Sequence, residues 1–108
     1  MYSEIVAKDL FDLLKTSPAP ILVDVRNLDE VLRGIIKDAV HIPLAALPAQ
    51  YESLAKTEHI VFYCHSGIRS AHAADFMVNK GYKNVSHLKG GIIAWGNAGY
   101  TFAPKTEG

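Results

Sequence analysis

Cysteine is nearly absent from this chain of 108 residues, which holds one, Cys64. A single thiol excludes an internal disulfide, so a small secreted fold stapled by disulfides is not expected. Long apolar runs are also missing. No stretch approaches the roughly 18 residues of a membrane-spanning helix, and the N-terminus lacks the basic and then apolar pattern of a signal peptide. We therefore expect a cytoplasmic protein without a membrane partner.

An excess of charge of one sign is missing as well. The 11 Lys and Arg residues balance the 11 Asp and Glu residues, and the basic residues do not cluster. A basic patch is the usual mark of a nucleic-acid-binding protein, so no nucleic-acid partner is expected. The five histidines show no metal-ligand spacing with Cys64, apart from the adjacent His65, and adjacent residues rarely ligate one metal together. We expect neither a metal nor another cofactor.

Length and composition predict one domain over residues 1–108. A hydrophobic share of 49% and a charged share of 20% are typical of soluble globular proteins. The chain is long enough for one core but not for two. We expect that core over about residues 5–100 and a flexible tail over residues 103–108.

Segments of strand and helix character alternate along the chain. The expected strands are 21–25, 40–43, 59–63 and 85–88, and the expected helices are 6–14, 27–32, 48–54, 69–80 and one after Gly90-Gly91. In helix 69–80 we expect Ala71, Ala74, Met77 and Val78 to face the core. This alternation predicts an α/β fold with a mainly parallel central sheet and helices on both faces. Ligands of such sheets bind beyond the carboxyl ends of the strands, where Cys64 and the segment 24–26 are expected.

Cys64 stands where an apolar strand ends and a glycine-containing loop leads into the helix expected from Arg69. Gly67 lets the backbone curl without a steric cost. The free N–H groups of residues 65–70 and the positive end of the helix dipole favour an anion. A lone intracellular cysteine is more often a small buried hydrophobe, but this setting favours a nucleophilic thiolate with a lowered pKa.

The loop Cys64-His-Ser-Gly-Ile-Arg69 resembles the active-site loop of the rhodanese family of sulfurtransferases. Other segments are similar to further signatures of that family, in the same order. They are Asp24-Val-Arg26 with Glu30, Gly34 with Ala39-Val-His-Ile-Pro43, Gly81-Tyr82 with Asn84-Val85, and Leu88-Lys-Gly-Gly-Ile-Ile-Ala-Trp95. Together they span about residues 5–100. The resemblance implies a rhodanese-like fold.

The resemblance also implies a reaction. Cys64 would take a sulfane sulfur from a small anionic donor such as thiosulfate and hold it as a persulfide. The sulfur would then pass to cyanide, or to a low-molecular or protein thiol such as thioredoxin, since a second cysteine is missing. The substrate-binding residues implied are the loop residues His65, Ser66, Gly67, Ile68, Arg69 and Ser70. Their amides would hold the persulfide, and the Arg69 guanidinium would orient or neutralise the donor.

Two alternatives from other functional classes stay open. The chain could be a non-catalytic rhodanese-like module that binds a partner or senses redox state through Cys64. It could also be a phosphatase or arsenate reductase of similar loop design. The phosphatases related to the rhodanese family carry a longer Cys-x5-Arg loop, whereas this chain has Cys-x4-Arg. His65 departs from the family pattern, because many members carry Arg there.

Several polar residues near the loop could have more than one role. Asp24 and Arg26 are candidate supporting residues, and we expect mainly an ion pair that holds the strand ends together. Glu30 could be a solvated helix residue, an arginine partner or an acid catalyst. Ser66 and Ser70 could hydrogen-bond the sulfur, or Ser70 could cap the helix.

Overall fold

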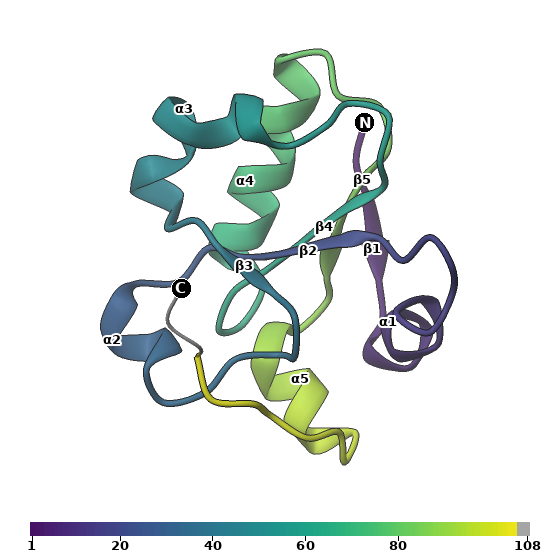
Figure 1. The fold of residues 1–108 in the computed structure, drawn as a ribbon, viewed down its shortest axis with the longest axis vertical. Helices are drawn as coiled ribbons and strands as arrows, with labels where there is room; N and C mark the ends of the chain where they lie inside the picture. The colour runs from purple at the N-terminus through teal and green to yellow at the C-terminus, as the bar shows by residue number, and fades with distance from the viewer. Residues whose placement is uncertain (106–108) are drawn as a thin grey trace.

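The computed structural model describes residues 1–105, and within them five strands form one sheet in the order β1-β5-β4-β2-β3, with every neighbouring pair parallel (Figure 1). The strands are β1 (Ser3–Ile5), β2 (Ile21–Asp24), β3 (Val40–His41), β4 (Ile60–Tyr63) and β5 (Val85–Leu88). The α-helices are α1 (Ala7–Leu13), α2 (Leu28–Val31), α3 (Leu47–Gln50), α4 (Ile68–Asn79) and α5 (Gly91–Asn97). Two 3₁₀ turns, η1 (Leu44–Ala46) and η2 (Tyr51–Ser53), flank α3.

The predicted α/β fold is confirmed, with helices on both faces of a parallel sheet. Figure 1 shows α3 and α4 on one side of the sheet and α1 and α5 on the other. All four residues of β4 are buried, because helices cover both of its faces. This explains why β4 is a continuous apolar run rather than an alternating one.

Two elements differ from the expectation. Strand β1 is short and polar, so the sequence did not predict it, yet it pairs with β5 through the register Ser3↔Ser86. The helix expected over 48–54 is instead the succession η1, α3 and η2. Short pieces suffice here because Leu47 and Leu54, rather than a full helical stripe, fill the core on that side.

The buried face of α4 matches the expected one only in part. The helix begins at Ile68, and its buried residues are Ser70, Ala73, Ala74 and Met77. Positions at intervals of three and four residues form one face of a helix. The expectation is confirmed for Ala74 and Met77, and Val78 packs against the same cluster although it is only partly buried. It is wrong for Ala71, which lies at the flank of that face and is only partly buried.

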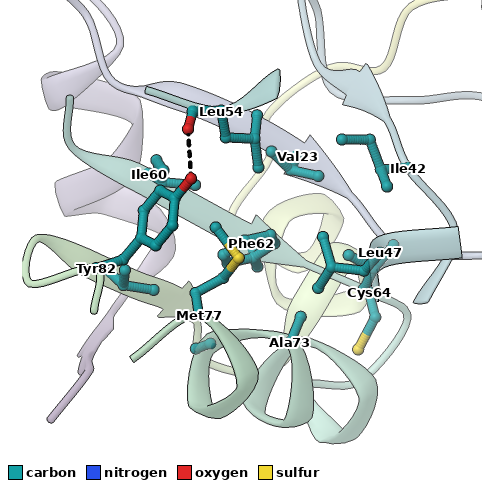
Figure 2. Packing of buried hydrophobic residues seen from close by; sticks show 13 residues of the cluster. Val23, Ile42, Leu47, Leu54, Ile60, Phe62, Cys64, Ala73, Met77 and Tyr82 are labelled. Atoms are coloured by element: carbon teal, nitrogen blue, oxygen red, sulfur yellow. Dashed lines mark hydrogen bonds between the residues drawn. The ribbon is translucent and has the colours of Figure 1, made fainter. Parts of the chain in front are cut away.

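The core has one cluster on each face of the sheet. Under α3 and α4 the cluster includes Phe62, Met77 and Tyr82, whose hydroxyl donates to the Leu54 carbonyl at 2.6 Å (Figure 2). Under α1 and α5 the second cluster is centred on Tyr63 and on helix residues such as Trp95. Figure 2 also shows Cys64 at the edge of the first cluster, with its sulfur beside α4.

The C-terminal segment is paired further than expected. A flexible tail was predicted from residue 103, but Ala103 and Ile35 exchange backbone hydrogen bonds of 2.8 and 2.7 Å in an antiparallel bridge. Residues 106–108 of the predicted tail lie outside the described residues. Across residues 1–105 the structure contains no helix with the length and apolar character needed to cross a membrane.

Truncation of Met77 tests the packing of α4 on the sheet. Its side chain is fully buried, so Met77→Ala should lower the free energy of unfolding by about 2–5 kcal/mol through lost contacts and a residual cavity. Urea unfolding followed by circular dichroism measures this. His72→Ala, on the exposed face of the same helix, should change stability by less than about 0.5 kcal/mol. Equal effects in the two variants would contradict the packing described.

Candidate active site

The Cys64 loop joins the carboxyl end of β4 to the start of α4. Tyr63 is the last residue of β4, and the chain then turns back over residues 64–67. Gly67 is the residue that precedes α4, with φ of +112° in a region that side chains other than glycine rarely adopt. The turn at Gly67 therefore lets the first amides of α4 face the sulfur of Cys64.

The sulfur of Cys64 lies in a cradle of hydrogen-bond donors. The thiol is a free, buried cysteine with 1% exposure. Its Sγ accepts from the Gly67 N–H at 3.1 Å and from the Ser70 N–H at 3.3 Å, and it lies 3.6 Å from the Ser70 hydroxyl. The geometry is that of an anion-binding turn, with donors aimed at one atom.

These contacts favour the thiolate form of Cys64. Burial by itself would raise the pKa of the thiol. The Ser70 hydroxyl and then the backbone amides of Ser70, Gly67 and Ser66 outweigh it, and the pKa lies below its ordinary value. A thiolate is the nucleophilic form of cysteine. The site therefore combines a nucleophile with fixed positive dipoles.

The start of α5 holds the loop from behind. The N–H of Ile92 donates to the Cys64 carbonyl at 2.9 Å, and the N–H of Ile93 donates to the His65 carbonyl at 3.2 Å. Gly91 makes this approach possible, because a Cβ there would collide with the carbonyl oxygens of His65 and Cys64. The glycine pair at 90–91 is thus a close-packing device as well as a turn.

Glu30 is the partner of Arg69. Two parallel hydrogen bonds of 2.7 and 2.8 Å join the guanidinium to the carboxylate, across 39 residues of sequence. The hydrogen bonds from Arg69 lower the pKa of Glu30 to about 2, against the opposing effect of partial burial. Of the three readings that the sequence left open for Glu30, the structure shows the arginine partner. It fixes the guanidinium beside the loop and offsets part of its charge.

Asp24 and Arg26 form a buried ion pair. The Arg26 Nη2 lies 2.7 Å from Asp24 Oδ2, and the same nitrogen donates to the Gly34 carbonyl at 2.7 Å. Both residues are at most 5% exposed. The pair ties the carboxyl end of β2 to the following turn, as expected for a structural role.

A shallow hollow of about 410 Å³ opens in front of the loop. Its walls are Arg26, Glu30, Arg33, His65, Arg69 and Ile92. Side chains from four separate segments thus meet here, and three of them are arginines. The exposed side chains of Ser66 and Ile68 are not among these walls, although both belong to the loop. The hollow offers a surface suited to a small anion.

Sequence reasoning missed His87. It lies on β5, and its Nδ1 is 3.1 Å from the Ser70 hydroxyl oxygen, so it contacts a residue that contacts the sulfur. The signal was present, because β5 carries two polar residues, Ser86 and His87, inside a fully buried strand. Over the part of the chain that the structure describes, no group of three His, Cys, Asp or Glu side chains is placed to hold a metal ion.

The Glu30–Arg69 pair predicts an acid-sensitive component of stability. Because the pKa of Glu30 falls from an ordinary 4.5 to about 2 on folding, this component is full above pH 4.5 and is lost as the pH falls toward 2. Urea unfolding of the wild type and Glu30→Gln should show a stability gap at pH 6 that closes by pH 2. A constant gap would contradict it. Glu52→Gln is the control at an exposed glutamate, and the difference in stability between wild type and this variant should not close in the same way between pH 6 and pH 2.

Comparison with known proteins agrees with this geometry. The model of the rhodanese-like domain matches residues 6–98. A sulfurtransferase of Allochromatium vinosum is 36% identical over 92% of both chains, and the thiosulfate sulfurtransferase GlpE of Coxiella burnetii is 32% identical over 88% of both. The crystal structure of a rhodanese-related protein from Thermoplasma volcanium superposes with a TM-score of 0.88 at 31% identity, over 96% of this chain and 100% of that one. The chain therefore belongs to the rhodanese-like domain family.

Proposed function

We propose that this protein is a sulfurtransferase that carries a sulfane sulfur on Cys64. The donor is a small anion such as thiosulfate, and the acceptor is cyanide or a low-molecular or protein thiol such as thioredoxin. The observation that carries the proposal is the Cys64 sulfur, which contacts two backbone amides and a hydroxyl in a loop whose residues His65 and Arg69 line an arginine-rich hollow. The names of the sulfurtransferase relatives support it.

In the first half-reaction the Cys64 thiolate attacks the outer sulfur of thiosulfate. A new S–S bond forms at Cys64, the S–S bond of thiosulfate breaks, and sulfite leaves with the bonding electron pair. In the second half-reaction the acceptor attacks the outer sulfur of the persulfide. The Cys64 thiolate then leaves, and cyanide becomes thiocyanate. The sequence has one cysteine, so the sulfur must go to an acceptor outside the chain.

Both half-reactions concentrate negative charge on sulfur, and the loop supplies donors for it. The amides of Gly67 and Ser70 are fixed by the backbone and need no reorganisation when charge develops. Arg69 adds a full positive charge at the rim of the hollow. A cation at ~4 Å offsets on the order of 4 kcal/mol of repulsion at an effective dielectric near 20, and Glu30 reduces this contribution because it shares the guanidinium.

The mass of the intact protein tests the persulfide directly. Wild-type protein incubated with thiosulfate should gain one sulfur atom, about 32 Da, because covalent catalysis leaves the transferred group on the nucleophile. Cyanide should remove this mass and release thiocyanate. Cys64→Ser is the matched control and should gain nothing. Absence of the gain with thiosulfate and other sulfane donors would favour the non-catalytic module, and release of phosphate from a phosphoester would favour the phosphatase.

Replacement of Arg69 tests its part in donor capture. Arg69→Ala should lower kcat/KM for thiosulfate about tenfold to a hundredfold, the loss expected for one charge-assisted hydrogen bond. Steady-state assays of thiocyanate formation measure this. Arg33→Ala is a suitable comparison, because this exposed arginine also lines the hollow and forms no ion pair within residues 1–105. Equal losses in the two variants would show that only the overall charge of the hollow matters.

A further inference from the structure

A chain of four side chains leads from the Cys64 sulfur to the surface. The Ser70 hydroxyl oxygen lies 3.6 Å from Cys64 Sγ and 3.1 Å from His87 Nδ1. On the far side of the ring, His87 Nε2 lies 3.3 Å from Glu4 Oε2. Ser70 and His87 are buried, whereas the Glu4 side chain is 52% exposed. The chain therefore connects a buried thiol to a solvated carboxylate.

The sheet order places these residues together. Strand β5 lies between β1 and β4, and His87 pairs with Glu4 on one side and with Phe62 on the other. Helix α4 packs on the same sheet and brings Ser70 over His87. Residues 4, 64, 70 and 87 thus meet although the sequence separates them widely.

The donors and acceptors of this chain can align in one direction. A carboxylate only accepts, so the hydrogen of a neutral His87 ring lies on Nε2 and points to Glu4. Nδ1 is then an acceptor for the Ser70 hydroxyl, and Ser70 Oγ keeps a lone pair for the Cys64 thiol. The Gly67 carbonyl, 3.2 Å from Ser70 Oγ, is a competing acceptor at a slightly longer distance. Burial lowers the pKa of His87 against the opposing effect of Glu4, which favours the neutral ring that this arrangement needs.

We propose that His87 takes up the proton of the Cys64 thiol through the Ser70 hydroxyl. The S–H bond breaks as Ser70 Oγ gains that hydrogen, and the hydroxyl hydrogen of Ser70 passes to His87 Nδ1. The products are a thiolate and an imidazolium, and the net charge is unchanged. This role rests on the proposed function, because a sulfurtransferase needs the thiolate before it meets the donor. His87 is a positioning residue, since it acts through Ser70.

The surroundings of His87 suit this role. Glu4 from β1 is the charged group that meets the ring, and it stabilises the imidazolium once the proton has arrived. The Tyr2 ring meets the imidazole edge-on at a centroid distance of 5.5 Å, and Ser70 from α4 covers the remaining nitrogen. From the end of β4, Cys64 is the titratable group that reaches His87 through Ser70. The proton therefore has a defined site and a counter-charge.

The pH dependence of alkylation by iodoacetamide tests the relay without any sulfur donor. A thiol coupled to a base titrates in two macroscopic steps. Wild-type Cys64 should therefore show a plateau of reactivity between a lower step, where the thiolate–imidazolium pair forms, and an upper step. His87→Asn keeps a polar side chain but cannot hold the proton. It should lose the plateau, with an alkylation rate about tenfold lower near pH 7 and a wild-type rate above the upper step, as for a one-unit rise in thiol pKa.

Other variants separate the relay from a structural role. Ser70→Ala should lose the plateau as His87→Asn does, and Ser70→Thr should keep it because the hydroxyl remains. Glu4→Gln should lower the plateau, and this exposed site leaves the core intact even if His87→Asn does not fold. His59→Asn is the matched control, because that histidine also bonds a serine of β5, Ser86, at 2.8 Å, and no hydrogen bond among the described residues joins this pair to Cys64.

Two results would overturn the relay. One is a profile for His87→Asn, or for Glu4→Gln, with the same steps as the wild type. The other is an equal loss of the plateau in His59→Asn, which would indicate a general effect of perturbing the sheet. Neither result depends on sulfur transfer. A plateau without a mass gain from thiosulfate would support the relay and contradict the proposed function, and the reverse pattern would do the opposite.

Discussion

The close packing of the Cys64 loop on the first turn of α5 is the constraint on which the site depends. The carbonyls of Cys64 and His65 accept hydrogen bonds from α5, and a side chain at Gly91 would collide with both of them. Because α5 holds these carbonyls on one side of the loop, the amides of Gly67 and Ser70 point to the Cys64 sulfur on the other. The donors to sulfur are therefore backbone groups with no rotamer freedom to lose, which is the kind of preorganisation that a developing anion requires.

Electrostatics around the loop follow from this placement. Burial disfavours a thiolate, and the amides with the Ser70 hydroxyl reverse that effect. Two of the three arginines that line the hollow are in ion pairs, Arg69 with Glu30 and Arg26 with Asp24. Paired arginines keep a fixed orientation, so these two present directed N–H groups to the hollow.

The sequence predicted much of the local structure because the signals are local. Buried strands such as β4 are continuous apolar runs, and Gly67 after Cys64 marks a turn into a helix. The prediction of one helix over 48–54 was wrong, and β1 was missed. Both regions consist of short segments, whose form is decided by packing. The burial of Ser70 and Ala73 on α4 was missed because serine and alanine give a weak hydrophobic pattern.

What the sequence by itself determined is the alternation of strands and helices, the parallel sheet, and a thiol at a strand end followed by a loop able to bind an anion. Only the tertiary structure decided the partners of that loop. Glu30 meets Arg69 across 39 residues, and His87 meets Ser70 because β5 inserts between β1 and β4. Local propensity reports how a segment folds, whereas strand order sets which distant side chains share a site.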